Sequence, residues 1–150
     1  MDNKVIVLSQ VPPPTNGSTV MTRIFIKELE TLNFEVELVD RRFSYTINEI
    51  NKFQFKKILA LFGLIQRSLI LIVKNWRYRG NITLVSFIST SKFAFYSDFL
   101  ITLLFHIFGF KIVLYLHTNS EHLTKVRSLR SSLFSYCLKF SKCVVVLSET

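Results

Sequence analysis

The feature that most constrains the fold is the alternation of short apolar runs with longer segments of helical periodicity. The short runs predict five strands, over residues 4–8, 33–40, 81–87, 111–116 and 143–148. Helices are predicted between them, over residues 18–32, 52–76 and 92–108, and at some point within 121–140. Short apolar strands that alternate with helices build a parallel sheet covered on both faces. We therefore expect an α/β fold with a doubly wound, mainly parallel, Rossmann-like sheet.

The first predicted helix is amphipathic, with apolar residues at spacings of three and four. Its apolar face holds Met21, Phe25, Leu29 and Leu32, with Val20 and Ile24 beside them. Arg23, Lys27 and Glu30 lie away from that face. Ser18 is predicted to cap the helix, because a hydroxyl oxygen accepts a hydrogen bond from an N–H group of the first turn.

Composition limits the size, location and partners of the protein. The 150 residues suffice for a single domain with a sizeable core, and the apolar content of 49% argues against disorder. The net charge of +9 favours acidic partners: nucleic acid, an anionic membrane surface or phosphorylated substrates. Cys137 and Cys143 lack CxxC spacing, which favours a reducing cytosol. We expect no signal peptide, and no membrane span, because the apolar stretches 58–73 and 99–116 are both interrupted.

The loop after the first predicted strand combines Pro12, Pro13 and Pro14 with the sequence Asn16-Gly17-Ser18. Ligands of open parallel sheets bind at the carboxyl ends of the strands, so this loop is expected to border a site. We expect the prolines to hold the loop extended and Gly17 to let a ligand approach the backbone. The N–H groups of Ser18 and Thr19 could then face a phosphate or carboxylate at the helix N-terminus. A plain strand-to-helix turn explains the composition of the loop equally well.

The common nucleotide-binding motifs do not fit this loop. GxGxxG is absent, because Gly17 is the only glycine in the turn. Asp40 ends the second predicted strand at a suitable separation for a ribose contact, but without the glycines this signal is weak. GxxxxGK[ST] is absent as well, which excludes a P-loop.

Three blocks in order along the chain resemble retaining glycosyltransferases of family 4. Residues 5–30 resemble the opening of that family, in which a strand leads through a proline-containing, Gly-Gly-type loop into the first helix. Residues 108–118 resemble its fourth strand, which ends in a histidine at the cleft. Residues 143–150 resemble its fifth strand. The chain departs from the family at Asn16-Gly17, which stands where Gly-Gly is usual.

The resemblance implies a GT-B architecture of two Rossmann-like domains that face each other across a cleft. Residues 1–150 would be a single, incomplete N-terminal acceptor-binding domain, and the C-terminal donor-binding domain would be absent. The family's paired glutamates, with seven residues between them, have no counterpart in this sequence. The chain alone is therefore expected to be inactive. A nucleotide-sugar is the implied co-substrate, with no other cofactor, and no metal site is expected because no His, Asp and Glu cluster has ligand spacing.

The resemblance and the strand-end rule together select the candidate site residues. His117 is the candidate catalytic residue, because a neutral imidazole there could hydrogen-bond a sugar hydroxyl or stabilise developing charge. The candidate acceptor-binding residues are Asn16, Gly17, Ser18, Ser89, Ser91 and Thr118, and the candidate donor-side rim is Ser148 and Glu149. An ordinary polar loop explains the serines after the third strand equally well. His106 is interpreted as structural, and His122 and Asp98 as solvated residues.

The helical segment from residue 52 joins many cations to apolar residues. The candidate membrane-surface residues are Lys52, Lys56, Lys57, Lys74, Arg77 and Arg79, with Arg67 in the same segment. A basic amphipathic helix is typical of binding to an anionic membrane surface. A second basic cluster, Lys125, Arg127 and Arg130, points the same way. A core-facing helix with a solvated polar face remains an equal alternative.

The sequence thus favours the N-terminal domain of a hexosyltransferase-type glycosyltransferase. It would bind a sugar or lipid-linked acceptor for retaining transfer from a nucleotide-sugar, in the synthesis of a cell-surface polysaccharide or glycolipid. Its expected location is cytoplasmic, peripheral to the inner face of the cell membrane, with no nucleic-acid partner. The alternative is a basic α/β module that binds nucleic acid or a nucleotide.

Overall fold

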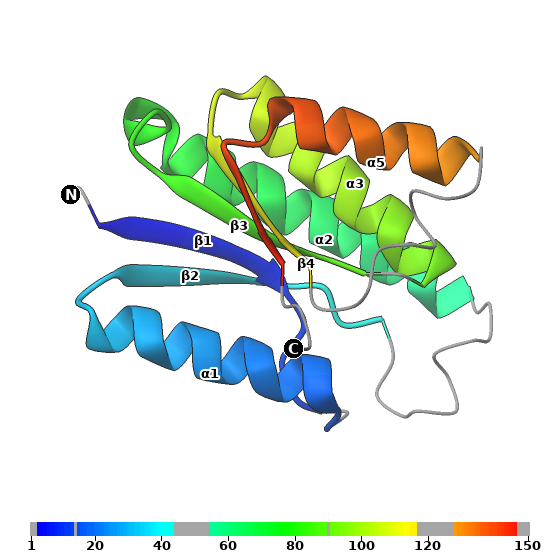
Figure 1. The fold of residues 1–150 in the computed structure, drawn as a ribbon, viewed down its shortest axis with the longest axis horizontal. Coiled ribbons are helices and arrows are strands. Elements are labelled where there is room, and N and C mark those ends of the chain that lie inside the picture. The colour runs from blue at the N-terminus through cyan, green and yellow to red at the C-terminus, as the bar shows by residue number, and fades with distance from the viewer. Residues whose placement is uncertain (1–2, 14, 44–54, 90, 117–127, 147–150) are drawn as a thin grey trace.

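A five-stranded parallel sheet forms the centre of the computed structural model (Figure 1). Its strands are β1 (Lys4–Ser9), β2 (Glu35–Asp40), β3 (Thr83–Ile88), β4 (Lys111–Leu116) and β5 (Cys143–Val146). Their order is β2-β1-β3-β4-β5, and all neighbouring strands are parallel. The structure describes residues 3–13, 15–43, 55–89, 91–116 and 128–146. The prediction of a Rossmann-like α/β fold is confirmed.

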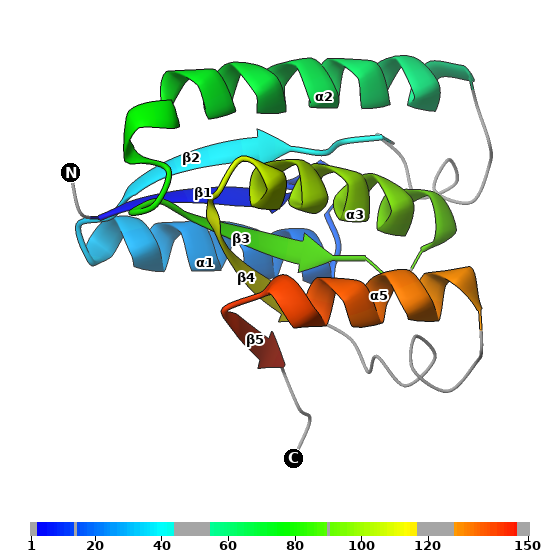
Figure 2. The ribbon, with the colours of Figure 1, turned by 90° about the horizontal axis from the view of Figure 1, so that it is seen from above.

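Helices cover both faces of the sheet. They are α1 (Gly17–Thr31), α2 (Phe55–Lys74), α3 (Lys92–Ile107) and α5 (Leu129–Phe140), and α2 is followed by the short 3₁₀ helix η2 (Trp76–Tyr78). Figure 2 shows α2, α3 and α5 side by side on one face, with α3 in the middle, and α1 beyond the sheet on the other. The predicted helix 52–76 is corrected at its end, because the α-helix stops at Lys74.

Strand side chains alternate between two apolar clusters, as a period of two requires. On the side of α2, α3 and α5, Leu8 and Leu114 belong to a large cluster with Phe105 of α3, all three at 0% exposure. On the side of α1, the ring of Phe25 lies 5.4 Å from that of Phe87, measured between centroids. Because both strand faces are packed, the sheet is the rigid base from which its carboxyl-end loops extend.

The buried face of α1 differs from the prediction. Phe25 and Leu29 pack on the sheet as predicted, but Leu32 is 64% exposed, and Val20 and Ile24 also lie at the surface. Thr19 and Thr22 are buried in their place. The hydroxyl of Thr22 forms a hydrogen bond of 2.7 Å with that of Ser9, at the polar end of β1. The helix is thus rotated toward its threonines, because they find polar partners that apolar residues could not use.

Gly109 ends α3 at the residue where the sequence predicted the helix to close. Its φ is 84°, and its N–H donates to the carbonyl of His106 at 2.9 Å while that of Phe110 donates to Phe105 at 3.1 Å. These bonds satisfy carbonyls that the helix end leaves open.

Substituting this glycine gives a first test of the fold. Gly109→Ala is expected to lower the free energy of unfolding by about 1 kcal/mol, because alanine is strained at positive φ. Gly63→Ala is the matched control: among the described residues, no atom lies within 4 Å of a Cβ built there. Within α2, that alanine is expected to raise stability by about 0.5–1 kcal/mol. Urea denaturation measures both, and equal losses in the two variants would contradict the assignment.

Candidate functional site

A cavity of about 200 Å³ lies where the loops after β1 and β3 meet. Its lining residues are Gln10, Asn16, Ser18, Thr19, Arg41, Phe43, Lys57, Ser89, Ser91, Phe93 and Ala94. The chain leaves β1 through α1 on one face of the sheet, and returns to β3 from α2 on the other, so this is the topological switch point of the sheet. Ligands of open α/β sheets bind at that point. We call this space the switch-point cavity.

The first helix is capped by Asn16 and not by Ser18, so that prediction is wrong. The side-chain oxygen of Asn16 accepts from the Thr19 N–H at 3.0 Å, and the Thr19 hydroxyl accepts from the Asn16 N–H at 3.1 Å. This reciprocal pair is a capping box. It engages the Thr19 N–H, which was expected to face a ligand.

The cap is open to a direct test. Asn16→Ala is expected to lower the free energy of unfolding by about 1 kcal/mol, because it leaves N–H groups of the first turn without a partner. Ser18→Ala should change stability by less than about 0.5 kcal/mol, since it lies inside the helix and is only partly buried. A larger loss in Ser18→Ala would contradict the assignment of the cap.

The remainder of the loop also differs from the extended conformation predicted for it. Pro12 and Pro13 form a bend, and the peptide bond between them is cis. Pro14 lies outside the described residues. Gly17 is the exposed first residue of α1 and does not line the switch-point cavity.

An ion pair between Arg41 and Asp98 lies behind the cavity and ties three loops together. Arg41 follows β2 and is 7% exposed, whereas Asp98 lies on α3 and is 0% exposed. Asp98 also accepts a hydrogen bond of 2.9 Å from the backbone N–H of Ser89, which follows β3. The backbone N–H of Arg41 donates to the carbonyl of Ser9 at the end of β1. The pair thus connects α3 to the carboxyl ends of three strands.

This buried pair retains unused hydrogen-bonding capacity. Arg41 Nε and Asp98 Oδ1 are both buried and have no hydrogen-bond partner within the part of the chain that the structure describes. Burial raises the pKa of Asp98 to about 6, although the Arg41 guanidinium and the Ser89 N–H favour its charged form. The interpretation of Asp98 as a solvated residue is therefore wrong. The sequence does contain one signal of a buried, paired carboxylate: Asp98 is the only acidic residue of a largely apolar predicted helix.

A second cavity, of about 480 Å³, adjoins the first on the side of α2. Its lining residues are Asp40, Arg41, Arg42, Phe43, Leu59, Ala60, Gly63, Leu64 and Arg67, and we call it the arginine cavity. Arg42 pairs with Asp40 at 2.8 Å. Burial raises the pKa of Asp40, opposed by the charges of Arg42 and Arg67. Because Arg41 and Phe43 line both cavities, the two spaces share one wall.

The structure brings together four of the predicted acceptor-binding residues. Asn16, Ser18, Ser89 and Ser91 all line the switch-point cavity. The other candidates, His117, Thr118, Ser148 and Glu149, lie outside the described residues, as does His122. Sequence reasoning missed Lys57 and the two phenylalanines of this cavity, because their neighbours in sequence belong to apolar or basic runs.

The remaining histidine lies away from both cavities. The ring of His106 stacks on that of Phe140, with 4.3 Å between centroids. This contact joins the last turns of α3 and α5, and it agrees with the structural role expected for His106.

The predicted membrane-surface cations divide into different environments. Lys57 is 4% exposed and borders the switch-point cavity, so it does not lie on the surface and that prediction is wrong. Lys74 pairs with Glu37 of β2, and the guanidinium of Arg79 lies 4.4 Å from the centre of the Trp76 ring. Lys56 and Arg77 are exposed. In the second basic cluster, the Arg130 guanidinium lies 5.3 Å from the centre of the Phe95 ring; Lys52, Lys125 and Arg127 lie outside the described residues.

Comparison with known proteins assigns no family. Neither a protein-family model nor a curated protein sequence matches the chain. The structure supports an α/β domain with a five-stranded parallel sheet. Among its described helices, none combines the length and hydrophobicity needed to cross a bilayer. The described residues also hold no group of three His, Cys, Asp or Glu that could bind a metal ion.

Proposed function

We propose that the chain is the acceptor-side domain of a retaining glycosyltransferase, and that the switch-point cavity binds the acceptor. The observation that carries the proposal is the lining of this cavity. Four candidate residues border one space at the switch point of a Rossmann-like sheet: Asn16 and Ser18, from a loop that resembles the family, and Ser89 and Ser91, from the strand-end rule. They come from loops more than seventy residues apart in sequence, so local composition alone does not explain their meeting.

The chemistry of the lining suits a sugar that carries a phosphate. Serine hydroxyls and the Gln10 amide can exchange hydrogen bonds with sugar hydroxyls, while the rings of Phe43 and Phe93 supply apolar surface. Arg41 and Lys57 add two buried cations, and the N-termini of α1 and α3 approach the same space. A phosphorylated ligand would meet both kinds of group at once.

The remaining roles follow from the resemblance as proposals. The donor would be a nucleotide-sugar held mainly by a second domain, with Ser148 and Glu149 at its rim. His117 would act at the reacting carbon. The reaction would take place at the cytoplasmic side of the cell membrane, on an acceptor for a polysaccharide or glycolipid.

A nicotinamide cofactor or nucleic acid is the second candidate ligand. The cations of Arg41 and Lys57 would suit the phosphates of either one. Residue-resolved NMR separates the candidates, with glucose 1-phosphate, NADH and duplex DNA as probes. Glucose 1-phosphate is expected to shift the amide signals of Asn16, Ser18, Ser89 and Ser91. Shifts of these signals with NADH or DNA, and none with glucose 1-phosphate, would overturn the proposal.

A pair of variants tests the hydroxyls themselves. The double variant Ser89→Ala/Ser91→Ala is expected to weaken glucose 1-phosphate binding by about thirtyfold, because two hydrogen bonds of about 1 kcal/mol each are lost. Ser132→Ala/Ser135→Ala is the matched control, since both serines are exposed on α5. Calorimetric titration measures the affinities. An equal loss in both variants would contradict a role for the cavity hydroxyls.

A further inference from the structure

Helix α2 carries a row of large apolar side chains that point away from the core. They are Phe55, Leu59, Phe62, Leu69, Ile70 and Val73, and their exposed fractions run from 40% to 73%. At about 100° per residue they fall on one side of the helix, within an arc of about 100°. We call this row the apolar stripe. A contiguous exposed patch of this kind indicates an interaction surface.

The opposite side of α2 packs against the rest of the chain. Leu64 and Ile72 are buried in the large cluster, and the helix contacts β2 and α3. Figure 2 shows α2 at the outer edge of the helix layer, with α3 on one side of it. No described element of the chain covers the apolar stripe.

A row of cations flanks the stripe. Lys56, Arg67 and Lys74 are separated by 11 and 7 residues, which are close to whole numbers of helical turns, so they share one flank of α2. Residues 55–74 include no Asp or Glu. Lys74 is paired with Glu37, whereas Lys56 and Arg67 are exposed at the surface. This flank is therefore complementary to an anionic surface.

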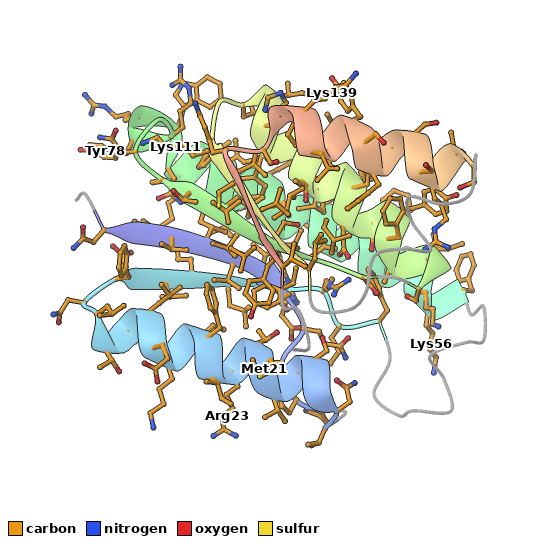
Figure 3. All side chains as sticks on the ribbon, in the orientation of Figure 1. Met21, Arg23, Lys56, Tyr78, Lys111 and Lys139 are labelled. Carbon is orange, nitrogen blue, oxygen red and sulfur yellow. The ribbon has the colours of Figure 1, made fainter. Side chains whose placement is uncertain are left out.

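Amphipathic aromatic residues extend the stripe at its far end. Trp76 and Tyr78 of η2 are 43% and 47% exposed, beside the exposed Arg77. Figure 3 shows Lys56 and Tyr78 at opposite ends of the α2–η2 segment. Trp and Tyr are enriched where a membrane meets water, because one end of each side chain is apolar and the other polar.

We propose that α2 and η2 form a docking face that lies in the surface of an anionic bilayer, with the apolar stripe inserted. A helix of 20 residues measures about 30 Å along its axis, and would lie parallel to the membrane plane. A bilayer suits this face better than a protein partner does, because the cationic flank runs along the whole helix without an acidic residue. Nothing in this inference depends on sugar transfer.

The arginine cavity opens on the same flank of α2. Leu59 belongs both to the stripe and to the cavity lining, and Arg67 belongs both to the cation row and to that lining. A helix inserted through its stripe would hold this cavity at the level of the lipid phosphates. Arg67 would then meet a headgroup phosphate beside the wall that leads to the switch-point cavity.

Vesicle sedimentation tests the docking face. The chain is expected to sediment with phosphatidylcholine vesicles that contain phosphatidylglycerol, and less with phosphatidylcholine alone. Phe62→Ser/Val73→Ser should weaken this binding on the order of a hundredfold, because two inserted apolar side chains are lost. The matched control is Val20→Ser/Ile24→Ser, since these two apolar residues are exposed on α1. The control should bind vesicles as the unchanged chain does.

The charges are tested separately. Lys56→Glu/Arg67→Glu is expected to weaken binding to the anionic vesicles by at least about thirtyfold. Each cation near an anionic surface contributes about 1 kcal/mol, which is about a fivefold change, and the two introduced carboxylates add repulsion. Arg23→Glu/Lys27→Glu on α1 is the control of equal charge. Equal losses of vesicle binding in the two charge variants would contradict a role for the cationic flank, because net charge alone would then explain binding.

Three further outcomes would overturn docking on a bilayer. One is equal binding of the stripe variant and its α1 control. Another is a stripe variant that binds vesicles normally but converts a dimer to a monomer in light scattering, which would assign the stripe to a second copy of the chain. The third is full displacement from vesicles by soluble glycerol phosphate, which would assign the arginine cavity to a free phosphate. Glucose 1-phosphate binding at the switch-point cavity is measured without lipid, so the two proposals can fail independently.

Discussion

Replacing Arg41 with methionine is expected to lower the free energy of unfolding by about 3–5 kcal/mol at neutral pH. The guanidinium is the countercharge of Asp98, whose side chain is 0% exposed. Without it the carboxylate must either stay charged in an apolar interior or take up a proton. Both alternatives cost free energy, because burial alone already raises the pKa of this group.

Two controls separate the loss of charge from the loss of packing. The double variant Arg41→Met/Asp98→Asn should recover part of the stability at neutral pH, since no buried carboxylate remains. Arg42→Met should cost no more than about 1 kcal/mol, because its partner Asp40 is partly open to water. Urea denaturation measures all three variants. A double variant less stable than Arg41→Met alone would contradict the proposed role of the pair.

The sheet could be predicted from the sequence because each strand is an apolar run. Residues 111–116 form the predicted strand without change, and the first and third strands differ by no more than two residues at either end. The parallel direction of the strands could be predicted from the helices between them, since parallel neighbours need a crossover connection. Local pattern and tertiary packing agree here, so the local pattern was sufficient.

The ion pair behind the cavity could not be predicted in the same way. Arg41 and Asp98 are 57 residues apart, and they meet because the ends of β2 and β3 lie on either side of β1. No local spacing carries that information. The wrong cap has a different cause. Asn16 and Thr19 stand three residues apart, so the sequence does contain the reciprocal cap, but the neighbouring Ser18 also offers a capping hydroxyl.

The orientation of α2 lay beyond the sequence because the helix is apolar on most of its surface. Periodicity alone cannot decide whether Leu64 and Ile72 or Phe62 and Val73 face the core. The structure buries the first pair and leaves the second exposed. Lys57 lies on the same side as the buried pair, so a cation that the sequence placed on the surface lines the switch-point cavity instead.

The stability of the protein is expected to depend on pH through Asp98. Its pKa is about 6 in the folded chain, against 3.8 for an ordinary aspartate, so between these values the folded state binds more protons than the unfolded state. Stability contributed by the protonated carboxyl is therefore present below about pH 4 and lost as the pH rises to about 6. A shift of about two pKa units corresponds to about 3 kcal/mol. As the pH rises over this interval, the free energy of unfolding of the unchanged chain should fall by this amount relative to that of Asp98→Asn, whose side chain does not titrate.

Glu37 supplies the opposite sign within the same molecule. Although burial alone would raise the pKa of Glu37, hydrogen bonds from Lys74, Lys4 and Asn75 lower it overall. Its contribution to stability is present above the ordinary pKa of glutamate and is lost as the pH falls. Glu37→Gln should thus lose on the unchanged chain as the pH rises to about the ordinary glutamate value of 4.5, and should keep a constant difference above it. Denaturation curves from about pH 4 to 7 should show Asp98→Asn gaining on the unchanged chain as the pH rises. If Asp98→Asn kept a constant difference from the unchanged chain across this range, the carboxyl would already be ionised at pH 4 and the pair would be held by charge alone.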